Sequence, residues 1–306
     1  MSKKLLYLLG ILGTIAIGTW LMSFMCCPTC CQNQTSETTS PVTELIDNAG
    51  MGDYNKFNLS GKDLTYSCND NFRFLSNDFK NIQPVNDSIN NGIGLLKTYF
   101  DKNKDKLVIT GYALNSEKNN STYPNLALAR ANYMKNYFVS KGIASNRFEL
   151  KGELRDAWKM SGDTILGNAD FRIMQAEEVA TEKVEDWAAM KAKINANPLI
   201  LYFNTGQAQI NLTDDEKQKV ADLSRYLDNV DDAKLNAVGH TDSDGNRDTN
   251  LKLGLNRANF AKDYLAKNGI VGNKIDASSK GPDEPIADNK TADGKAKNRR
   301  TVVTLN

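Results

Sequence analysis

The chain repeats one pattern of strands and amphipathic stretches with a period of about 128 residues. Phe72-Arg-Phe-Leu-Ser-Asn and Ile200-Leu-Tyr-Phe-Asn-Thr both have the aromatic-rich pattern of a short strand. Ile82 and Ile210 follow these two segments at the same offset. A chain that repeats itself at this distance should contain two similar folding units, and this expectation limits the architecture more than any other feature.

Both copies continue with the pattern of an amphipathic helix. In the second copy, Thr213 and Glu216 have the spacing of a capping box, which predicts a helix that begins there. One apolar face follows at helical spacing, at Val220, Leu223 and Leu227. The stretch from Asp87 to Tyr99 is its counterpart in the first copy.

A second strand, a second helix and a terminal strand complete each copy. These segments are 107–111, 128–131 and 171–174 in the first copy, and 235–239, 255–258 and 301–305 in the second. The order β-α-β-α-β, with helices long enough to cross over a sheet, implies sheets with parallel strand pairs under helices. The sequence therefore predicts an α/β protein of two tandem β-α-β-α-β domains, each an α+β sandwich.

The N-terminus predicts a membrane anchor. Leu5 to Met25 runs for 21 residues without an ionisable side chain, directly after Lys3 and Lys4. As a helix it would be about 31 Å long, enough to cross a hydrocarbon core of ~30 Å. The lysines place the N-terminus in the cytoplasm and the rest of the chain across the membrane. A cleaved signal peptide, or a lipoprotein modified at Cys26, is the alternative interpretation.

Four cysteines cluster just after this segment, at Cys26, Cys27, Cys30 and Cys31. The Cys27-x-x-Cys30 spacing is typical of a redox pair or half of a metal site, but no second pair follows at zinc-site spacing. Together with Cys68 the count is odd, which favours an intermolecular bridge in an oxidising compartment. A disulfide-linked or helix-paired dimer is one hypothesis. Gly10, Thr14 and Gly18 have the spacing of a helix-pairing face, although small residues are also common in membrane helices in general. No metal site and no cofactor are predicted.

These patterns divide the chain into five parts. The parts are a membrane anchor with the cysteine cluster at 1–31, a linker and lead-in at 32–69, the first copy at 70–176, a connecting helix at 177–197 and the second copy at 198–306. Residues 32–43 hold one apolar side chain, Val42, and read as a tether. The connecting helix should begin near Thr181, with Val184, Trp187, Ala188 and Ile194 on one face.

Charge and residue types exclude several classes of function. Lys and Arg number 38 against 37 Asp and Glu, so the chain lacks the basic field that nucleic-acid binding requires. The single histidine, His240, has no second ligand or nucleophile nearby in sequence, so we expect it to serve packing or a loop hydrogen bond. No catalytic residue is predicted, and the chain is not expected to be an enzyme.

The second copy carries a dense motif. It reads Gly239-His-Thr-Asp242, Gly245, Asn250, Leu253, Arg257-Ala258, Gly281-Pro-Asp-Glu-Pro285 and Asn298-Arg299-Arg300. With these residues the chain closely resembles the OmpA-like C-terminal peptidoglycan-binding family over about 198–306. The resemblance implies non-covalent binding of the peptide stem of peptidoglycan, with the key acid at Asp242 and the key arginine at Arg257.

Residue chemistry fits that implication. Asn250, Gly254 and Arg257 lie on one helical stripe, and Asp242 lies in the loop that leads into the helix. The diaminopimelate of a stem ends in an ammonium and a carboxylate on one carbon, which Asp242 and Arg257 would bind in turn. The predicted binding residues are Asp242, Arg257, Thr241, Asn250 and Leu253, supported by Asn298, Arg299 and Arg300.

Two plainer interpretations of these residues remain. Asp242 and Arg257 alone could form an ordinary surface ion pair, worth ~0–1 kcal/mol. The oxygens of Asp242, Asp244, Asn246 and Asp248 alternate like those of a calcium loop, although the glycine stands at the fourth place and Leu253 replaces the final acid.

The first copy has the same order of predicted strands and helices but lacks the full set of predicted binding residues. Leu114 aligns with Asp242, Arg130 lacks its acid, and Glu117 is a poor geometric replacement. We expect a divergent copy that serves packing, spacing or partner contact.

The predicted function is a single-pass tether between a cell-envelope membrane and the cell wall, with periplasmic domains and possible outer-membrane association. The alternative is a MotB-type stator subunit, or a scaffold whose repeats bind proteins, but the membrane span holds no acidic proton relay.

Overall fold

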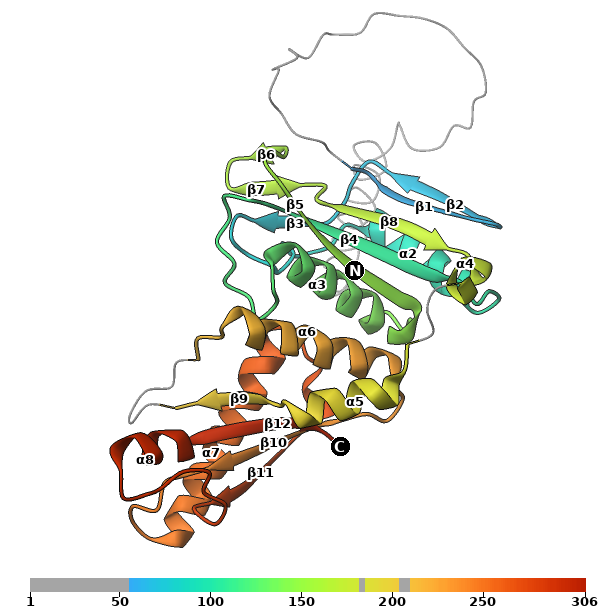
Figure 1. Cartoon of the computed structure of the whole chain (residues 1–306). Coiled ribbons are helices and arrows are strands. Elements are labelled where there is room, and N and C mark those ends of the chain that lie inside the picture. The colour runs from blue at the N-terminus through green and yellow to red at the C-terminus, as the bar shows by residue number, and fades with distance from the viewer. Residues whose placement is uncertain (1–54, 182–184, 204–209) are drawn as a thin grey trace, which may run out of the picture. The chain divides into compact units, whose positions relative to one another are not determined.

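The computed structural model describes residues 55–181, 185–203 and 210–306 (Figure 1). Ala49–Asn306 form one compact unit. The predicted membrane anchor, cysteine cluster and polar tether lie outside the described residues. Within the described ranges, no helix combines the length and the apolar character needed to cross a membrane. We call residues 55–181 the N-terminal half and residues 185–306 the C-terminal half.

The N-terminal half opens with an antiparallel hairpin of β1 (Phe57–Gly61) and β2 (Leu64–Cys68). Phe57 and Leu59 alternate with polar residues, and both are fully buried in the core. The folded region therefore begins before residue 70, inside the range interpreted as linker and lead-in.

The central sheet of this half has the order β5-β4-β8. Strand β4 (Lys106–Leu114) is parallel to β5 (Phe148–Arg155) and antiparallel to β8 (Ala169–Met174). Helix α3 (Leu126–Ser140) covers β4 and β5, whereas α2 (Asp87–Phe100) packs on the hairpin (Figure 1). A short 3-10 turn, η1 (Ser145–Arg147), leads into β5.

The predicted opening strand of the first copy is shorter than expected. Strand β3 (Arg73–Leu75) pairs with β7 (Thr164–Leu166), which pairs with β6 (Met160–Ser161) in a separate small sheet. The side chain of Asn81 accepts a hydrogen bond from the Arg73 amide at 2.7 Å. The amide of Ile82 donates to the Arg73 carbonyl at 2.8 Å, so the chain folds back along β3. Strand β3 lies outside the sheet that contains β4.

The segment between the halves contains two helices instead of the single predicted one. These are α4 (Ala176–Thr181) and α5 (Trp187–Ala196), and Val184 lies outside the described residues. Asp186 caps α5 by accepting from the amide of Ala189. Trp187, Met190 and Ile194 pack against the C-terminal core, whereas Ala188 is exposed, contrary to the predicted face.

The C-terminal half has a four-stranded sheet of order β11-β10-β12-β9. Its strands are β9 (Leu199–Tyr202), β10 (Leu235–His240), β11 (Ile275–Gly281) and β12 (Arg300–Leu305). Its helices are α6 (Asp214–Asn229), α7 (Arg247–Lys267) and α8 (Ala292–Asn298), with a 3-10 turn η2 (Gly272–Lys274). Only β10 and β11 are parallel neighbours; β12 is antiparallel to both β10 and β9.

Helix α6 follows its prediction closely. Thr213 and Glu216 form both bonds of the capping box, and the predicted apolar face is buried. That face consists of Val220, Leu223 and Leu227. Burying each of these side chains contributes about 1.5–3 kcal/mol, so the face holds the helix to the sheet.

Two glycines set the distance between α7 and β10. A Cβ atom on Gly239 would overlap the carbonyl oxygen of Gly254, so the two backbones approach as only glycines permit. This contact brings α7 to the carboxyl end of β10. Arg257, one helical turn beyond Gly254, therefore lies next to the loop that follows the strand.

Helices α3 and α6 contact one another through polar side chains. Lys135 Nζ lies 2.6 Å from Asp228 Oδ2, and both side chains are largely buried. The Tyr123 hydroxyl donates to Ser224 Oγ at 3.1 Å. Burial lowers the pKa of Lys135 and raises that of Asp228, although the attraction between the two charges acts in the opposite direction, so this attraction offsets only part of the desolvation cost.

Candidate functional site

Arg257 presents a half-buried guanidinium at the end of β10. Its Nη1 donates to the carbonyl oxygen of His240 at 2.9 Å, and the guanidinium lies 5.8 Å from the centre of the Phe203 ring. Burial lowers the pKa of Arg257; the Asp242 carboxylate opposes this shift, and the positive charge of Arg299 adds to it. Arg257 forms no ion pair with any residue that the structure describes.

Asp242 lies close enough to act on Arg257, but its ion pair is with Arg299. Arg299 Nη1 donates to Asp242 Oδ2 at 2.9 Å, and about a sixth of each side chain is exposed. The other oxygen, Oδ1, accepts a long 3.3 Å bond from the amide of Asp244. Instead of the predicted pair, the structure contains a cluster of one carboxylate and two guanidinium groups. Arg299 was predicted only to support the site, but it pairs directly with Asp242.

Thr241 and Asn250 hold the loop that carries Asp242. Both are almost fully buried. Thr241 Oγ1 donates to the Asp242 carbonyl at 2.8 Å, and Asn250 Nδ2 donates to the Asp244 carbonyl at 2.8 Å. The structure therefore shows them fixing the backbone around Asp242. Leu253 is 42% exposed on α7 and offers the cluster an apolar neighbour.

Asn298 and Arg300 brace a second loop beside the cluster. Asn298 is fully buried, and its Oδ1 accepts from the amides of Ile286 and Ala287 at 2.8 and 3.1 Å. Its Nδ2 donates to Asn289 Oδ1, which also accepts from the Ser243 amide. Arg300 is buried and donates to the Glu284 carbonyl at 3.1 Å. These bonds tie the loop after β11 to the loop of Asp242.

His240 contributes its backbone to the cluster. The side chain is 3% exposed, and its Nδ1 has no hydrogen-bond partner among the described residues. Burial lowers the pKa of His240 to about 4, and the charge of Arg300 acts in the same direction. The imidazole is therefore neutral at neutral pH, and its packing agrees with the prediction for this residue.

The oxygens of the calcium-loop alternative are used elsewhere. Asp244 pairs with Lys295 at 2.8 Å, and Asn246 caps α7 by accepting from the amides of Asp248 and Thr249. In the described part of the chain, no group of three or more His, Cys, Asp or Glu side chains gathers as metal ligands.

The N-terminal half contains a close counterpart of the Arg257 environment. Arg130 of α3 donates from Nη1 to the carbonyl of Tyr112, directly after the strand glycine Gly111, at 3.0 Å. Its guanidinium lies 5.2 Å from the centre of the Phe74 ring. A Cβ on Gly111 would overlap the Ala127 carbonyl, just as one on Gly239 would overlap that of Gly254. Three features therefore recur around both arginines: a hydrogen bond to a strand carbonyl, a nearby aromatic ring, and a close approach of the helix to the strand.

The two environments differ in their acid. Glu117 forms a bidentate ion pair with Arg130, with Oε2 3.0 Å from Nη1 and Oε1 on Nη2, and both side chains are almost fully buried. The prediction that Arg130 lacks an acid is wrong. Glu117 reaches it because the chain turns tightly after β4, where the Leu114 amide donates to Glu117 Oε2 at 2.7 Å. The spacing of Leu114, Glu117 and Arg130 in the sequence does not indicate this turn.

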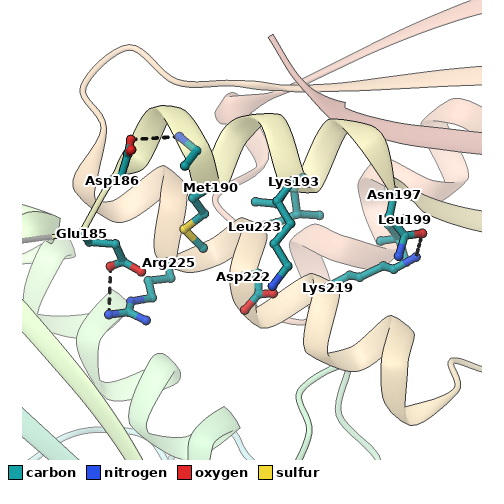
Figure 2. A pocket seen from close by; sticks show the side chains of 12 residues that line it. Glu185, Asp186, Met190, Lys193, Asn197, Leu199, Lys219, Asp222, Leu223 and Arg225 are labelled. Carbon is teal, nitrogen blue, oxygen red and sulfur yellow. Dashed lines mark hydrogen bonds and ion pairs between the residues drawn. The ribbon is translucent and has the colours of Figure 1, made fainter. Parts of the chain in front are cut away.

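A groove of about 420 Å³ lies between α5 and α6 (Figure 2). Two contacts join residues that line it. Arg225 pairs with Glu185 at 2.9 Å, and Lys219 Nζ donates to Asn197 Oδ1 at 2.7 Å. Met190 and Leu223 form part of its wall. None of the predicted binding residues lines the groove.

The model of the OmpA family matches residues 202–299. Residues 202–299 form an OmpA family domain. This OmpA family domain contains Asp242, Arg257 and Arg299, together with the loops that hold them.

Known proteins match part of this chain. Outer membrane protein A of Bordetella avium is 35% identical over 127 residues, which cover 42% of this chain and 64% of that protein. Peptidoglycan-binding protein ArfA of Mycobacterium tuberculosis is 34% identical over 121 residues, covering 39% of this chain and 36% of that protein. The chain spans less than two-thirds of the length of either relative. The crystal structure of the peptidoglycan-associated lipoprotein from Burkholderia pseudomallei matches with a TM-score of 0.31 and 24% identity, covering 35% of this chain and 89% of that one.

Proposed function

We propose that the OmpA family domain binds peptidoglycan without covalent chemistry, by gripping the free end of a stem diaminopimelate between Asp242 and Arg257. The observation that carries this proposal is the state of Arg257. Its half-buried guanidinium makes one hydrogen bond to His240 and no ion pair among the described residues. Such a partly desolvated cation gains most from a ligand carboxylate that matches its planar fork.

The carboxylate of Asp242 suits the ammonium of the same ligand. Arg299 occupies Oδ2, while Oδ1 carries only the long bond from the Asp244 amide. An ammonium can therefore approach Oδ1 while Arg299 keeps the carboxylate oriented. Leu253 lies exposed on the same helix as Arg257 and would contact the methylene chain of diaminopimelate. Thr241, Asn250 and Asn298 would hold the loops around the ligand.

The relatives support a role in the cell envelope. One of them is named as an outer membrane protein and another as a peptidoglycan-binding protein. We therefore propose a tether that joins an envelope membrane, held by the span at Leu5 to Met25, to the cell wall. The three contacts shared by Arg130 and Arg257 support a divergent first copy at 70–176 beside the binding copy at 198–306. A dimer through the cysteines or the membrane helix belongs to the same proposal, in which no catalytic step takes part.

Pelleting of the full chain with purified sacculi tests the proposal. Replacing Asp242 or Arg257 with alanine removes one partner of a desolvated charge pair, which costs ~2–5 kcal/mol or roughly 30-fold or more in affinity. Arg257→Lys should lose binding as well, because an ammonium cannot form the planar fork. Arg225→Ala is the matched control, since Arg225 lines the α5–α6 groove, which contains none of the predicted binding residues, and its removal should leave pelleting unchanged. Native pelleting by the folded Asp242→Ala/Arg257→Ala variant would refute the assignment.

A further inference from the structure

Arg130 lies in the same surroundings as Arg257, yet its carboxylate partner belongs to the chain itself. We infer that the pocket around Arg130 is a carboxylate-binding site that Glu117 fills as an internal ligand. The inference goes beyond the proposed function, because it concerns the N-terminal half and requires no peptidoglycan.

The hydrogen bonds of the two arginines show the difference. A guanidinium has five N–H donors, and all five of Arg130 are used. Its Nε donates to the Asp78 carbonyl at 2.9 Å, its Nη atoms donate to the carbonyls of Tyr112 and Leu75, and the last two bonds go to Glu117. Among the residues that the structure describes, Arg257 donates one bond, to the His240 carbonyl. Arg130 is therefore saturated in the way that a ligand-bound Arg257 would be.

The carboxylate of Glu117 is surrounded by hydrogen-bond donors from three other segments. Besides the two bonds from Arg130, its oxygens accept from the backbone amides of Leu114 at 2.7 Å and Asn77 at 2.9 Å. The donors come from the end of β4, the turn after β3 and helix α3. All of them lie outside the exposed loop that carries Glu117, so the receptor part of the site does not depend on that side chain.

The shape of the pocket indicates which ligand could replace Glu117. Truncation to alanine removes Cγ, Cδ and the two carboxylate oxygens, which are the four heavy atoms of acetate. The side chain is 2% exposed, whereas the neighbouring residues Ser116 and Lys118 are exposed, so truncation opens the pocket toward solvent. Leu114 stands near the pocket and offers no acceptor for an ammonium. The expected ligand is therefore a small monocarboxylate and not an amino acid.

Thermal unfolding of the full chain with Glu117→Ala, in sodium acetate and in sodium chloride of equal ionic strength, tests this inference. At ten times its dissociation constant, acetate should raise the midpoint by about 3 °C or more beyond chloride. The native chain and the Glu117→Ala/Arg130→Met variant should respond equally to both salts. An equal response of Glu117→Ala to both salts would overturn the inference, as would failure of this variant to fold in either salt.

A second measurement needs no substitution. In the unmodified chain, the Arg130 side-chain N–H protons should exchange with solvent at least tenfold more slowly than those of Arg257, because every donor of Arg130 is buried and bonded. Nuclear magnetic resonance of arginine side chains measures both rates in one sample. Comparable rates for the two arginines would contradict a filled Arg130 site.

Discussion

The use of hydrogen-bond donors separates two arginines that look alike in sequence. Arg130 and Arg257 both precede an alanine in a helix that follows the second strand of a repeat. The motif predicted that Arg257 would lie near Asp242, and the electrostatic influence of Asp242 on Arg257 agrees with this. Sequence could not reveal that Arg299 would hold Asp242, or that Glu117 would fold back onto Arg130. Both outcomes depend on loop conformation, which leaves no periodic signal.

Restoring an acid at position 114 should not create a second binding site. Leu114→Asp places a carboxylate near Arg130, but Glu117 and three backbone carbonyls already use every donor of that arginine. We expect the Leu114→Asp/Arg257→Ala chain to pellet with sacculi no better than Arg257→Ala alone. Recovery of pelleting in the double variant would show that the Arg130 site is open after all.

His240 should make stability depend on pH. Its pKa is about 4 in the folded chain and about 6.5 when unfolded, so the unfolded state binds the proton first as pH falls. The contribution is fully present above pH ~6.5 and is lost progressively toward pH 4. Between pH 7 and 5 this amounts to at most about 2 kcal/mol of unfolding free energy.

Denaturant titrations at both pH values measure this effect. His240→Gln removes the titrating group and should flatten the dependence over this interval, while the remaining slope reports carboxylates that titrate lower. An unchanged slope in His240→Gln would mean that His240 does not lose its proton on folding.

Helices with a regular apolar periodicity could be predicted from the sequence, whereas short elements fixed by local contacts could not. The capping box and apolar face of α6 appear as predicted, because both depend on residues within the helix. The hairpin β1–β2 was missed because it precedes the repeated pattern and lies in the range interpreted as linker and lead-in. Helix α8 was missed for a different reason: its seven residues are fixed by Thr291, which caps it, and by the bonds of Asn298.

The approach of α7 to β10 predicts a matched pair of glycine substitutions. Gly239→Ala places a methyl group against the Gly254 carbonyl and should cost about 1–3 kcal/mol or more, with weaker pelleting because Arg257 moves away from the His240 carbonyl. Gly94→Ala in the exposed face of α2 meets no atom and should stabilise by about 0.5–1 kcal/mol. Denaturant midpoints compare the two. A neutral Gly239→Ala would contradict the backbone contact.

At the scale of the whole molecule, α3 and α6 meet within the compact unit of residues 49–306. Asp228→Ala leaves the buried ammonium of Lys135 without its partner and should lower the unfolding free energy by ~3–5 kcal/mol. Lys135→Met/Asp228→Leu removes both charges and should unfold at a midpoint close to that of the native chain. If Asp228→Ala and the double variant are equally destabilised, the stranded charge is not the cause.

The sequence pattern predicted the mixed α/β architecture of this unit. In each half a strand glycine, Gly111 or Gly239, closely approaches the backbone of the helix that carries Arg130 or Arg257. The polar contact between α3 and α6 has no sequence signature, since Lys135 and Asp228 are ordinary charged residues on predicted helices. Lys135 and Asp228 become partners only when α3 and α6 pack against each other.

Competition by free meso-diaminopimelate tests whether Asp242 and Arg257 grip the end of the stem peptide. The full chain is bound to sacculi and then titrated with this amino acid. Cadaverine, which has no carboxylate, and adipate, which has no ammonium, are the controls. If Asp242 and Arg257 grip a carbon that bears both groups, diaminopimelate should release the chain at concentrations where neither cadaverine nor adipate releases it. Retention of the chain at saturating diaminopimelate, or equal release by adipate, would contradict the account.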